Sequence, residues 1–458
     1  MTNLVSRSPW TGAVLGEVSS ASSNDAATSV ALMAEAFAAW SAEAMRRRTL
    51  LNNFSARLIA ARSELVRLLI DEAGKNSVDA EAEADLLPKK IAISLGAGLA
   101  RTPQILLGGI GGISGTEPQV FWRPRGVAVI LGPFNFPLHL LHGLVVPALA
   151  VGCTVVAKPS ERCPLLGALY ARLLAESGLD GVCRVVQGGA EVAQVLIMQP
   201  EVATVAAVGG RMTGLALSKA LAGRPEVVLA LELGGVNPAL VLDDAEVASA
   251  ATAIADGAWR MAGQRCTATR QVHVPRSLHA RLIDALRQER QRWLPDGTPA
   301  GANGSLISAI ARQRFLADHA AAHDGLPLLA GDPTRTFGKS QCVEPLLRDV
   351  RDSDVRHQAL YRDEHFGPGL IVDAYDDLDE CVARLAANPY RLAASVFTAS
   401  RERFLALAPR LPYGQVNHNR PTAGARSDQP FGGLGLAGNA RPAALAAGAI
   451  FADESVVW

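Results

Sequence analysis

The stretch Gly126-Val-Ala-Val-Ile-Leu-Gly-Pro-Phe-Asn-Phe-Pro137 opens with a β-rich run, Val127–Leu131, and closes in a turn between two prolines. Similar β-rich runs recur further along, separated by helical stretches, at Thr154–Ala157, Val182–Val186, Val202–Val208 and Val227–Leu231. Apolar strands that alternate with helices are typical of βαβ units, in which helices cover both faces of a parallel sheet. This block predicts an α/β fold and is consistent with nucleotide binding.

A second α/β block begins near Asn237. It has a predicted strand at Ala239–Leu242 and a predicted helix across Ala245–Met261. Further strand-like runs follow at Arg270–Val274, Leu370–Val372 and Ser395–Phe397. The chain therefore divides into two consecutive α/β parts.

Two amphipathic patterns and one insert stand outside these blocks. Ser23–Trp40 and Arg46–Glu72 space their apolar residues for one buried helical face each. The Gly-rich segment Leu107–Gly115 leads into the alternating Gln119–Arg123. That pattern favours a projecting hairpin over a core element.

The composition limits the classes of function. A chain of 458 residues predicts two or three domains, and its 44 basic and 44 acidic residues give no general attraction to nucleic acid or membranes. The six cysteines form no CxxC pair, and the histidines do not cluster, so no metal site or disulfide framework is expected. The amino terminus lacks the apolar core of a signal peptide, and no apolar stretch reaches the length of a membrane span. We expect a cytoplasmic protein.

Cys266 is the candidate nucleophile, and Glu232 stands 34 positions before it, since 266 − 232 = 34. A thiolate can add to an electron-poor carbon, and a carboxylate can then activate water to release the product. Taken singly, the cysteine could be a small buried hydrophobe and the glutamate a solvated surface charge. The glycines that flank both residues favour covalent catalysis.

Six motifs strengthen this interpretation: Pro133-Phe-Asn-Phe-Pro137, Lys158-Pro-Ser-Glu161, Leu231-Glu-Leu-Gly-Gly235, Gly263-Gln-Arg-Cys266, Glu364-His-Phe-Gly-Pro368 and Pro430-Phe-Gly-Gly433. In this order they closely resemble the aldehyde dehydrogenase superfamily, along essentially the whole chain. The resemblance implies NAD(P)-dependent oxidation of an aldehyde to a carboxylic acid.

The resemblance also implies a three-part architecture. A Rossmann-like NAD-binding domain would comprise residues 1–105 and 124–234, and an α/β catalytic domain residues 235–440. A small β oligomerisation element would comprise residues 106–123 and 441–458. Such a protein is expected to form a homodimer or homotetramer.

The resemblance assigns the catalytic roles. Cys266 would attack the carbonyl carbon, and the backbone N–H of Cys266 with the side chain of Asn135 would stabilise the oxyanion. Glu232 would activate the water that hydrolyses the thioester, which favours a free acid as the product. Asn135 could otherwise be an ordinary turn residue between two prolines.

The cofactor residues follow from the same motifs. Lys158 and Glu161 come directly after a strand, where side chains reach the adenosine ribose in Rossmann-like folds. A carboxylate at Glu161 would repel a 2′-phosphate, so NAD is favoured over NADP. The remaining cofactor residues are Glu364 and Phe366 near the nicotinamide ribose, and Gly209 and Gly214 at a turn before a helix near the pyrophosphate.

The aldehyde itself is expected to be a small acidic semialdehyde. Within the superfamily the chain most resembles the succinylglutamate-semialdehyde dehydrogenase group of arginine catabolism, in segments such as Lys89-Lys-Ile-Ala-Ile-Ser94 and Val416-Asn-His-Asn-Arg-Pro421. Arg420 and Arg426, in the segment expected beside the aldehyde entrance, are the candidate carboxylate ligands. The alternatives are a broader aliphatic or aromatic aldehyde dehydrogenase and a catalytically silent binding protein on this fold.

Overall fold

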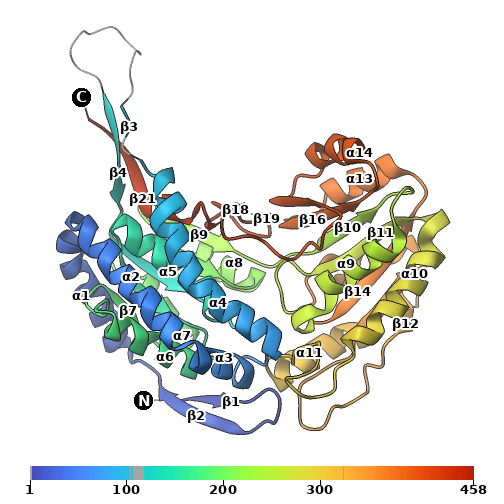
Figure 1. Cartoon of the computed structure of the whole chain (residues 1–458), viewed down its shortest axis with the longest axis horizontal. Helices are drawn as coiled ribbons and strands as arrows, with labels where there is room; N and C mark the ends of the chain where they lie inside the picture. Colours follow the sequence, from blue (N-terminus) through green and yellow to red (C-terminus); the bar gives the residue numbers. More distant parts are fainter. Residues whose placement is uncertain (1–2, 104, 107–117, 323, 458) are drawn as a thin grey trace.

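The computed structural model has two α/β lobes side by side, with a small sheet that projects from the first lobe (Figure 1). It describes residues 3–103, 105–106, 118–322 and 324–457. The predicted Gly-rich segment Leu107–Gly115 lies outside the described residues. Among these residues, no helix has both the length and the apolar character needed to cross a membrane.

The first lobe is built on a five-stranded sheet of order β7-β6-β5-β8-β9, in which every strand pair is parallel. Its strands are β5 (Val127–Leu131), β6 (Thr154–Lys158), β7 (Cys183–Val185), β8 (Val202–Val208) and β9 (Val228–Glu232). The helices between and after them are α5 (His139–Val151), α6 (Pro164–Glu176), α7 (Ala190–Ile197) and α8 (Arg211–Ala220). All five predicted strands and their parallel arrangement are confirmed.

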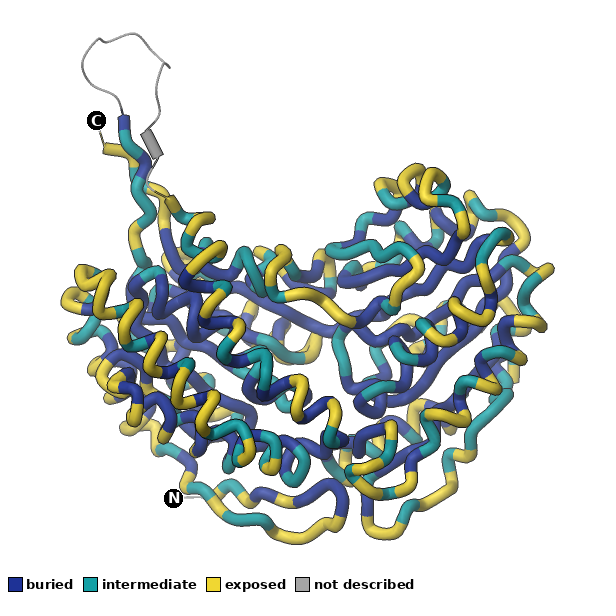
Figure 2. Tube along the Cα trace, in the orientation of Figure 1, coloured by how far each residue is buried: buried dark blue, intermediate teal, exposed yellow. Residues whose placement is uncertain are grey.

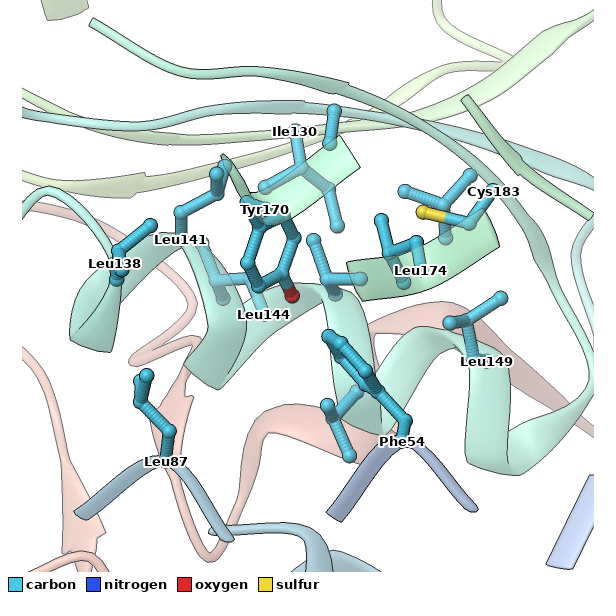
Figure 3. Close-up of a cluster of buried hydrophobic side chains, with 14 of the residues drawn as sticks. Phe54, Leu87, Ile130, Leu138, Leu141, Leu144, Leu149, Tyr170, Leu174 and Cys183 are labelled. Carbon is cyan, nitrogen blue, oxygen red and sulfur yellow. The ribbon is translucent and has the colours of Figure 1, made fainter. Parts of the chain in front are cut away.

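Helices cover both faces of this sheet because successive side chains of a strand point to opposite faces. Ala128 and Ile130 of β5 pack into a core with α5 and α6, part of which Figure 3 shows. Val127 and Val129 pack on the other face, in a core shared with α1 (Ser23–Ala42) and α7. The central strands β5 and β6 are accordingly buried along their length (Figure 2).

The second lobe contains a seven-stranded sheet of order β12-β13-β14-β11-β10-β16-β17, parallel except for β12. Its strands are β10 (Asn237–Val241), β11 (Thr269–Pro275), β12 (Leu328–Ala330), β13 (Leu346–Val350), β14 (Gly369–Tyr375), β16 (Ala393–Phe397) and β17 (Gln415–His418). Its helices are α9 (Val247–Trp259), α10 (Arg276–Arg290), α11 (Ala309–Ala320), α12 (Ala359–Arg362), α13 (Leu378–Ala386) and α14 (Arg401–Leu407). The strands predicted in this block are confirmed.

Short strands complete the molecule. A three-stranded antiparallel sheet of β3 (Ile105–Leu106), β4 (Gln119–Pro124) and β21 (Ala452–Val457) forms the projection in Figure 1. Two-stranded pairs are formed by β15 (Tyr390–Arg391) with β19 (Leu434–Gly435) and by β18 (Pro430–Phe431) with β20 (Ala443–Ala444). The predicted domain boundaries remain a prediction.

The amino-terminal part differs from the prediction in two ways. A hairpin of β1 (Asn3–Arg7) and β2 (Val14–Ser19) precedes the helices. The single helix predicted over Arg46–Glu72 is wrong, because α2 (Ala44–Ala60) and α3 (Arg62–Asp71) are separated at Ala61. Leu58, Leu65 and Leu69 all face one core, so the apolar spacing continues across the break and conceals it.

Helix α4 (Ser77–Ile93) was not predicted at all. Its buried face carries Asp79, Glu83 and Lys90, and Pro88 lies inside it. Buried charges interrupt the apolar period on which helix prediction depends. This helix contacts α5, and its Asp79 forms an ion pair with Arg260 at the start of the second lobe.

Candidate active site

The carboxyl ends of the first sheet lie level with one another. Leu131 pairs in register with Lys158 and with Ala207, and Val208 pairs with Glu232. In a parallel sheet the segments that leave these ends meet at one edge, which is where ligands bind in open α/β folds. The predicted residues after β5, β6 and β8, and Glu232 itself, therefore share this edge.

Cys266 follows a strained turn at the end of α9. Met261 and Ala262 have φ values of 57° and 51°, a left-handed conformation that typically costs about 1–3 kcal/mol for such residues. Gly263 has φ 65°, and a Cβ there would overlap the carbonyl of Gly367. The Asn303 side chain accepts the N–H of Ala262 at 2.6 Å, which helps to hold the turn.

Two buried polar side chains fix the segment around Cys266. Asn237 Nδ2 donates to the carbonyls of Cys266 and Ala268, at 2.8 and 2.9 Å. Arg270 donates to the carbonyls of Gly263 and Gly367, each at 2.7 Å. Both residues are fully buried. The prediction missed them, and only the position of Asn237, two residues after the Glu232 motif, offers a signal in the sequence.

Asn135 reaches the nucleophile segment from the first lobe. Its Nδ2 donates to the carbonyl of Gln264 at 2.9 Å, two residues before Cys266. The Asn135 side chain is buried. An amide NH₂ has two N–H donors, so one remains for another acceptor. The structure thus brings together two residues that the sequence places 131 positions apart, since 266 − 135 = 131.

Glu232 ends β9 and is only 4% exposed. Neither of its carboxylate oxygens has a hydrogen-bond partner of ordinary geometry among the described residues. Burial raises the pKa of Glu232 to about 8, against smaller opposing effects of the Gly433 amide and of Arg441. A carboxyl group in this state can gain or lose a proton near neutral pH.

The segment that holds Glu232 in place comes from near the end of the chain. The N–H of Leu233 donates to the carbonyl of Ala437 at 2.9 Å, and Asn439 accepts the N–H of Leu231 at 2.7 Å. At Gly432, a Cβ would come within 2.6 Å of a Glu232 carboxylate oxygen. The glycine therefore leaves room for the carboxylate.

Burial and charged neighbours shift the pKa of the Cys266 thiol. Its pKa is raised to about 12, first by burial and then by the charges of Glu232 and Glu364, while Arg265 acts in the opposite direction. The resting thiol is therefore protonated at neutral pH. A nearby base must take its proton before a thiolate can form.

Glu364 lies over the turn that follows Glu232. Its Oε1 accepts the N–H of Gly235 at 3.0 Å, and a Cβ on Gly234 would overlap its other oxygen. Burial raises the pKa of Glu364 to about 7, and the charge of Arg270 acts against this shift. Phe366 packs edge-on against Phe134, with ring centroids 5.8 Å apart.

Lys158 and Glu161 stand where β6 ends. The buried Lys158 Nζ lies 3.7 Å from a Glu161 carboxylate oxygen, and Glu161 keeps 45% of its side chain exposed. Burial lowers the pKa of Lys158, while Glu161 acts to raise it. A half-exposed carboxylate beside an anchored cation is free to accept hydrogen bonds from a ligand.

The two predicted glycines sit at the start of α8. The N–H of Gly209 donates to the carbonyl of Glu232 at 3.0 Å, and Gly210 begins the helix without a side-chain cap. The first amides of α8 are therefore available for negative charge. Gly214 packs against Leu233, where a Cβ would overlap the leucine side chain. Close packing alone accounts for this glycine, and its cofactor role remains a prediction.

These residues fit a dinucleotide. The edge of the first sheet offers helix amides for phosphate and the carboxylate of Glu161 for hydroxyl groups, and Glu364 adds a second carboxylate from the second lobe. Within the described part of the chain, no group of three or more His, Cys, Asp or Glu residues could hold a metal ion.

The predicted substrate arginines lie on the surface after β17. Arg426 forms a two-bond ion pair with Asp428 at 2.9 and 2.6 Å, with 58% of its side chain exposed. Arg420 is exposed and has no ion pair with a described residue. The structure does not bring either arginine into contact with Cys266, and their role remains a prediction.

The chain is similar to a family of known proteins over nearly its whole length. A model described as "Aldehyde dehydrogenase family" matches residues 2–451. N-succinylglutamate 5-semialdehyde dehydrogenase 1 of Caulobacter vibrioides is 36% identical, over 97% of this chain and 93% of that protein. The N-succinylglutamate 5-semialdehyde dehydrogenase of Erwinia tasmaniensis is also 36% identical, over 96% of this chain and 89% of that protein.

Solved structures share the fold. An indole-3-acetaldehyde dehydrogenase in complex with NAD⁺ superposes with a TM-score of 0.93 at 28% identity, over 100% of this chain and 93% of that chain. The resemblance drawn from the six motifs and the predicted α/β fold are both confirmed. The chain belongs to the aldehyde dehydrogenase family.

Proposed function

We propose that this member of the aldehyde dehydrogenase family oxidises an aldehyde to a free carboxylic acid with NAD, through a thioester on Cys266. One observation supports the proposal most directly. Asn135 donates a hydrogen bond to the Cys266 segment, and the charge of the buried Glu232 contributes to raising the pKa of the Cys266 thiol. A nucleophile, an oxyanion donor and a base are the three groups that acyl chemistry on a thiol requires.

In the first step the thiolate of Cys266 adds to the carbonyl carbon. The negative charge moves to the oxygen, where the backbone N–H of Cys266 and the free N–H of Asn135 can donate to it. Losing one such donor typically costs about 2.7–4 kcal/mol. Asn237 and Arg270 keep the Cys266 segment in place during this step.

NAD, when bound, supplies the hydride acceptor that converts the adduct on Cys266 into a thioester. Glu161, the amides at the start of α8 and Glu364 would hold it, with Lys158 anchoring Glu161. A 2′-phosphate beside Glu161 would place two like charges together, so NAD is preferred to NADP.

In the last step Glu232 removes a proton from the attacking water, and the thioester is hydrolysed. Its carboxylate is not engaged in any hydrogen bond of ordinary geometry with a described residue, so it is free to do so. The product is the free acid, and the Cys266 thiol is regenerated.

The proposed substrate is N-succinylglutamate 5-semialdehyde, which gives N-succinylglutamate. Two relatives with that named activity, each 36% identical to this chain, support it. A broader aliphatic or aromatic aldehyde dehydrogenase is the alternative. Arg420 and Arg426 are the proposed ligands for a substrate carboxylate at the surface.

We also propose a cytoplasmic homodimer or homotetramer. The outermost strand of the projecting sheet, β21, exposes Val456 and Val457. An edge strand with free backbone groups and apolar side chains is suited to pairing with a second chain. The base of β21 is tied to the first lobe by an ion pair between its Asp453 and Arg125, which lies between β4 and β5.

The test is NADH formation with a panel of aldehydes, for wild type and Cys266→Ala. The variant should lose aldehyde oxidation and keep its NAD affinity, because the thiol bonds to the substrate. Cys381→Ala, which removes a buried thiol from the second lobe, is the matched control and should stay active. Activity of Cys266→Ala within tenfold of wild type would refute the assignment.

A further inference from the structure

Lys90 is a buried cation without a partner. It lies in α4, is 6% exposed, and makes no hydrogen bond or ion pair with any described residue. An ammonium group that is removed from water without an anion is strongly destabilising. A stable protein keeps such a group only if something else compensates, so Lys90 requires an explanation.

The other buried charged residues on α4 have ion-pair partners. Asp79 pairs with Arg260 at 3.2 Å, and Glu83 pairs with Lys75 at 3.1 Å. Asp79 lies eleven residues and Glu83 seven residues before Lys90, and therefore both lie on the same face of the helix as Lys90. Of these three charged residues, Lys90 alone has no described partner.

The face that carries Lys90 looks towards α5, the helix that starts beside the candidate active site. Glu83 accepts the N–H groups of Leu138 and His139, at 3.1 and 2.9 Å, and so caps the start of α5. Two turns further along α4, the Lys90 ammonium reaches Gly143, where a Cβ would overlap Nζ. A larger residue at position 143 would displace the ammonium from this place.

The other groups around Lys90 cannot supply its missing anion. Burial, followed by the charge of Lys90, holds the pKa of His139 well below its usual value. Burial is also the main cause that lowers the pKa of His142 to about 3. Both histidines are neutral at pH 7. Burial lowers the pKa of Lys90 to about 8, which leaves it mainly protonated at that pH.

Asn135 lies in the turn before α5, four residues ahead of His139, and His139 and Gly143 lie four residues apart on one face of the helix. The ring atom Nδ1 of His139 is buried, but His139 and Leu140 keep part of their surface exposed, whereas Leu138, Leu141 and Leu144 pack in the core (Figure 3). His139 to Gly143 rises about 6 Å along α5, so Lys90 reaches α5 one turn beyond the end of the helix that Asn135 precedes.

We propose that Lys90 binds the distal carboxylate of an acidic semialdehyde whose aldehyde group lies at Cys266 and Asn135. This inference rests on the proposed function and specifies its substrate class. In N-succinylglutamate 5-semialdehyde, eight bonds separate the aldehyde carbon from the succinyl carboxylate carbon, about 10 Å when extended. That length exceeds the rise of about 6 Å from His139 to Gly143, so such a substrate can also extend over the turn that holds Asn135. The substrate carboxylate would complete the ion pair that the free protein lacks.

The sharpest test uses two substrates that differ only at the far end. One is N-succinylglutamate 5-semialdehyde, and the other is its N-butyryl analogue, in which a methyl group replaces the distal carboxylate. Wild type should prefer the succinyl compound by roughly 10- to 100-fold in kcat/KM, mainly through KM. Lys90→Met should abolish that preference while retaining activity on the butyryl compound.

The control is Lys89→Met, which removes the adjacent, exposed lysine of the same helix and should keep the wild-type preference. A readout without turnover is the thermal midpoint: N-succinylglutamate should raise it for wild type and for Lys89→Met, but not for Lys90→Met. Lys90→Gln serves in the same measurements if the methionine variant does not fold.

Several outcomes would overturn the inference. One is a preference for the succinyl compound that survives in Lys90→Met within twofold, and another is an equal loss of activity on both compounds. Equal use of both compounds by wild type would also overturn it, while the proposed function would stand. Failure of the proposed function looks different, because wild type would then form no NADH with any aldehyde. The thermal shift with N-succinylglutamate would still test Lys90 in that case.

Discussion

The candidate site has buried charged groups, here called its floor, and exposed charged groups, here called its rim. On the floor, Glu232 and Glu364 are removed from water, and burial raises the pKa of each. On the rim, Glu161 and Arg426 keep about half of their side chains exposed and are paired with a neighbour. Exposed charges are screened by water and contribute little, whereas buried charges shape the protonation of their surroundings. We expect mutational effects to decrease from the floor to the rim.

The floor itself contains a second contrast. Glu364 accepts a hydrogen bond from Gly235, while Glu232 has no such partner among the described residues. A carboxylate held by a donor is suited to positioning a ligand, and one without a donor is suited to moving a proton. Both are buried carboxylates near the same thiol, but substitution of each should impair a different step of the reaction.

The largest effect should come from Glu232→Gln. The change keeps the shape of the side chain but removes the base, so kcat should fall by about 10²–10⁴-fold and a thioester should accumulate on Cys266. Mass spectrometry of the acid-quenched enzyme would show the added acyl mass. Glu364→Gln is the control and should raise KM for NAD without accumulating the adduct. An unchanged rate in Glu232→Gln would mean that another group activates water.

The pH dependence should sharpen this contrast. Glu232 must be deprotonated to act, and its pKa is raised to about 8, so kcat should rise with pH up to about 8 and level off above it. Below that value the slope should approach tenfold per pH unit. Glu364→Gln should keep this limb of the profile, whereas the small residual activity of Glu232→Gln should lack it. A wild-type profile that is flat between pH 6 and 9 would contradict the assignment.

The sequence identified most of the strands and the candidate nucleophile and base for a physical reason. Strands buried on both faces, such as Val127–Leu131, read as continuous apolar runs, and Cys266 and Glu232 sit in motifs whose glycines are needed for close packing. Arg270 could not be found in this way, because its partner carbonyl at Gly367 lies 97 positions further along the chain. Lys90 was not identified because α4 buries charged residues, and these interrupt the apolar periodicity by which a helix is predicted.

At the rim, Glu161 should decide the choice of cofactor. Wild type should have a higher kcat/KM with NAD than with NADP, because the carboxylate opposes a 2′-phosphate. Glu161→Ala should narrow the gap, by roughly tenfold or less since the side chain is half-exposed. The measurement is the ratio of kcat/KM for the two cofactors with one aldehyde. Glu191→Ala, a second carboxylate whose charge acts on Lys158, is the control and should leave most of the preference intact.

The smallest effects should come from the surface arginines. Arg426 already pairs with Asp428, and exposed ion pairs are typically worth about 0–1 kcal/mol, so Arg426→Gln should change KM for N-succinylglutamate 5-semialdehyde by no more than about twofold. Arg420→Gln should have a somewhat larger effect, because Arg420 has no described ion-pair partner to neutralise it. Both variants should be compared with wild type on an uncharged aldehyde of similar length. A tenfold increase in KM for the acidic substrate alone, in either variant, would show that a surface arginine, and not the buried Lys90, recognises the substrate carboxylate.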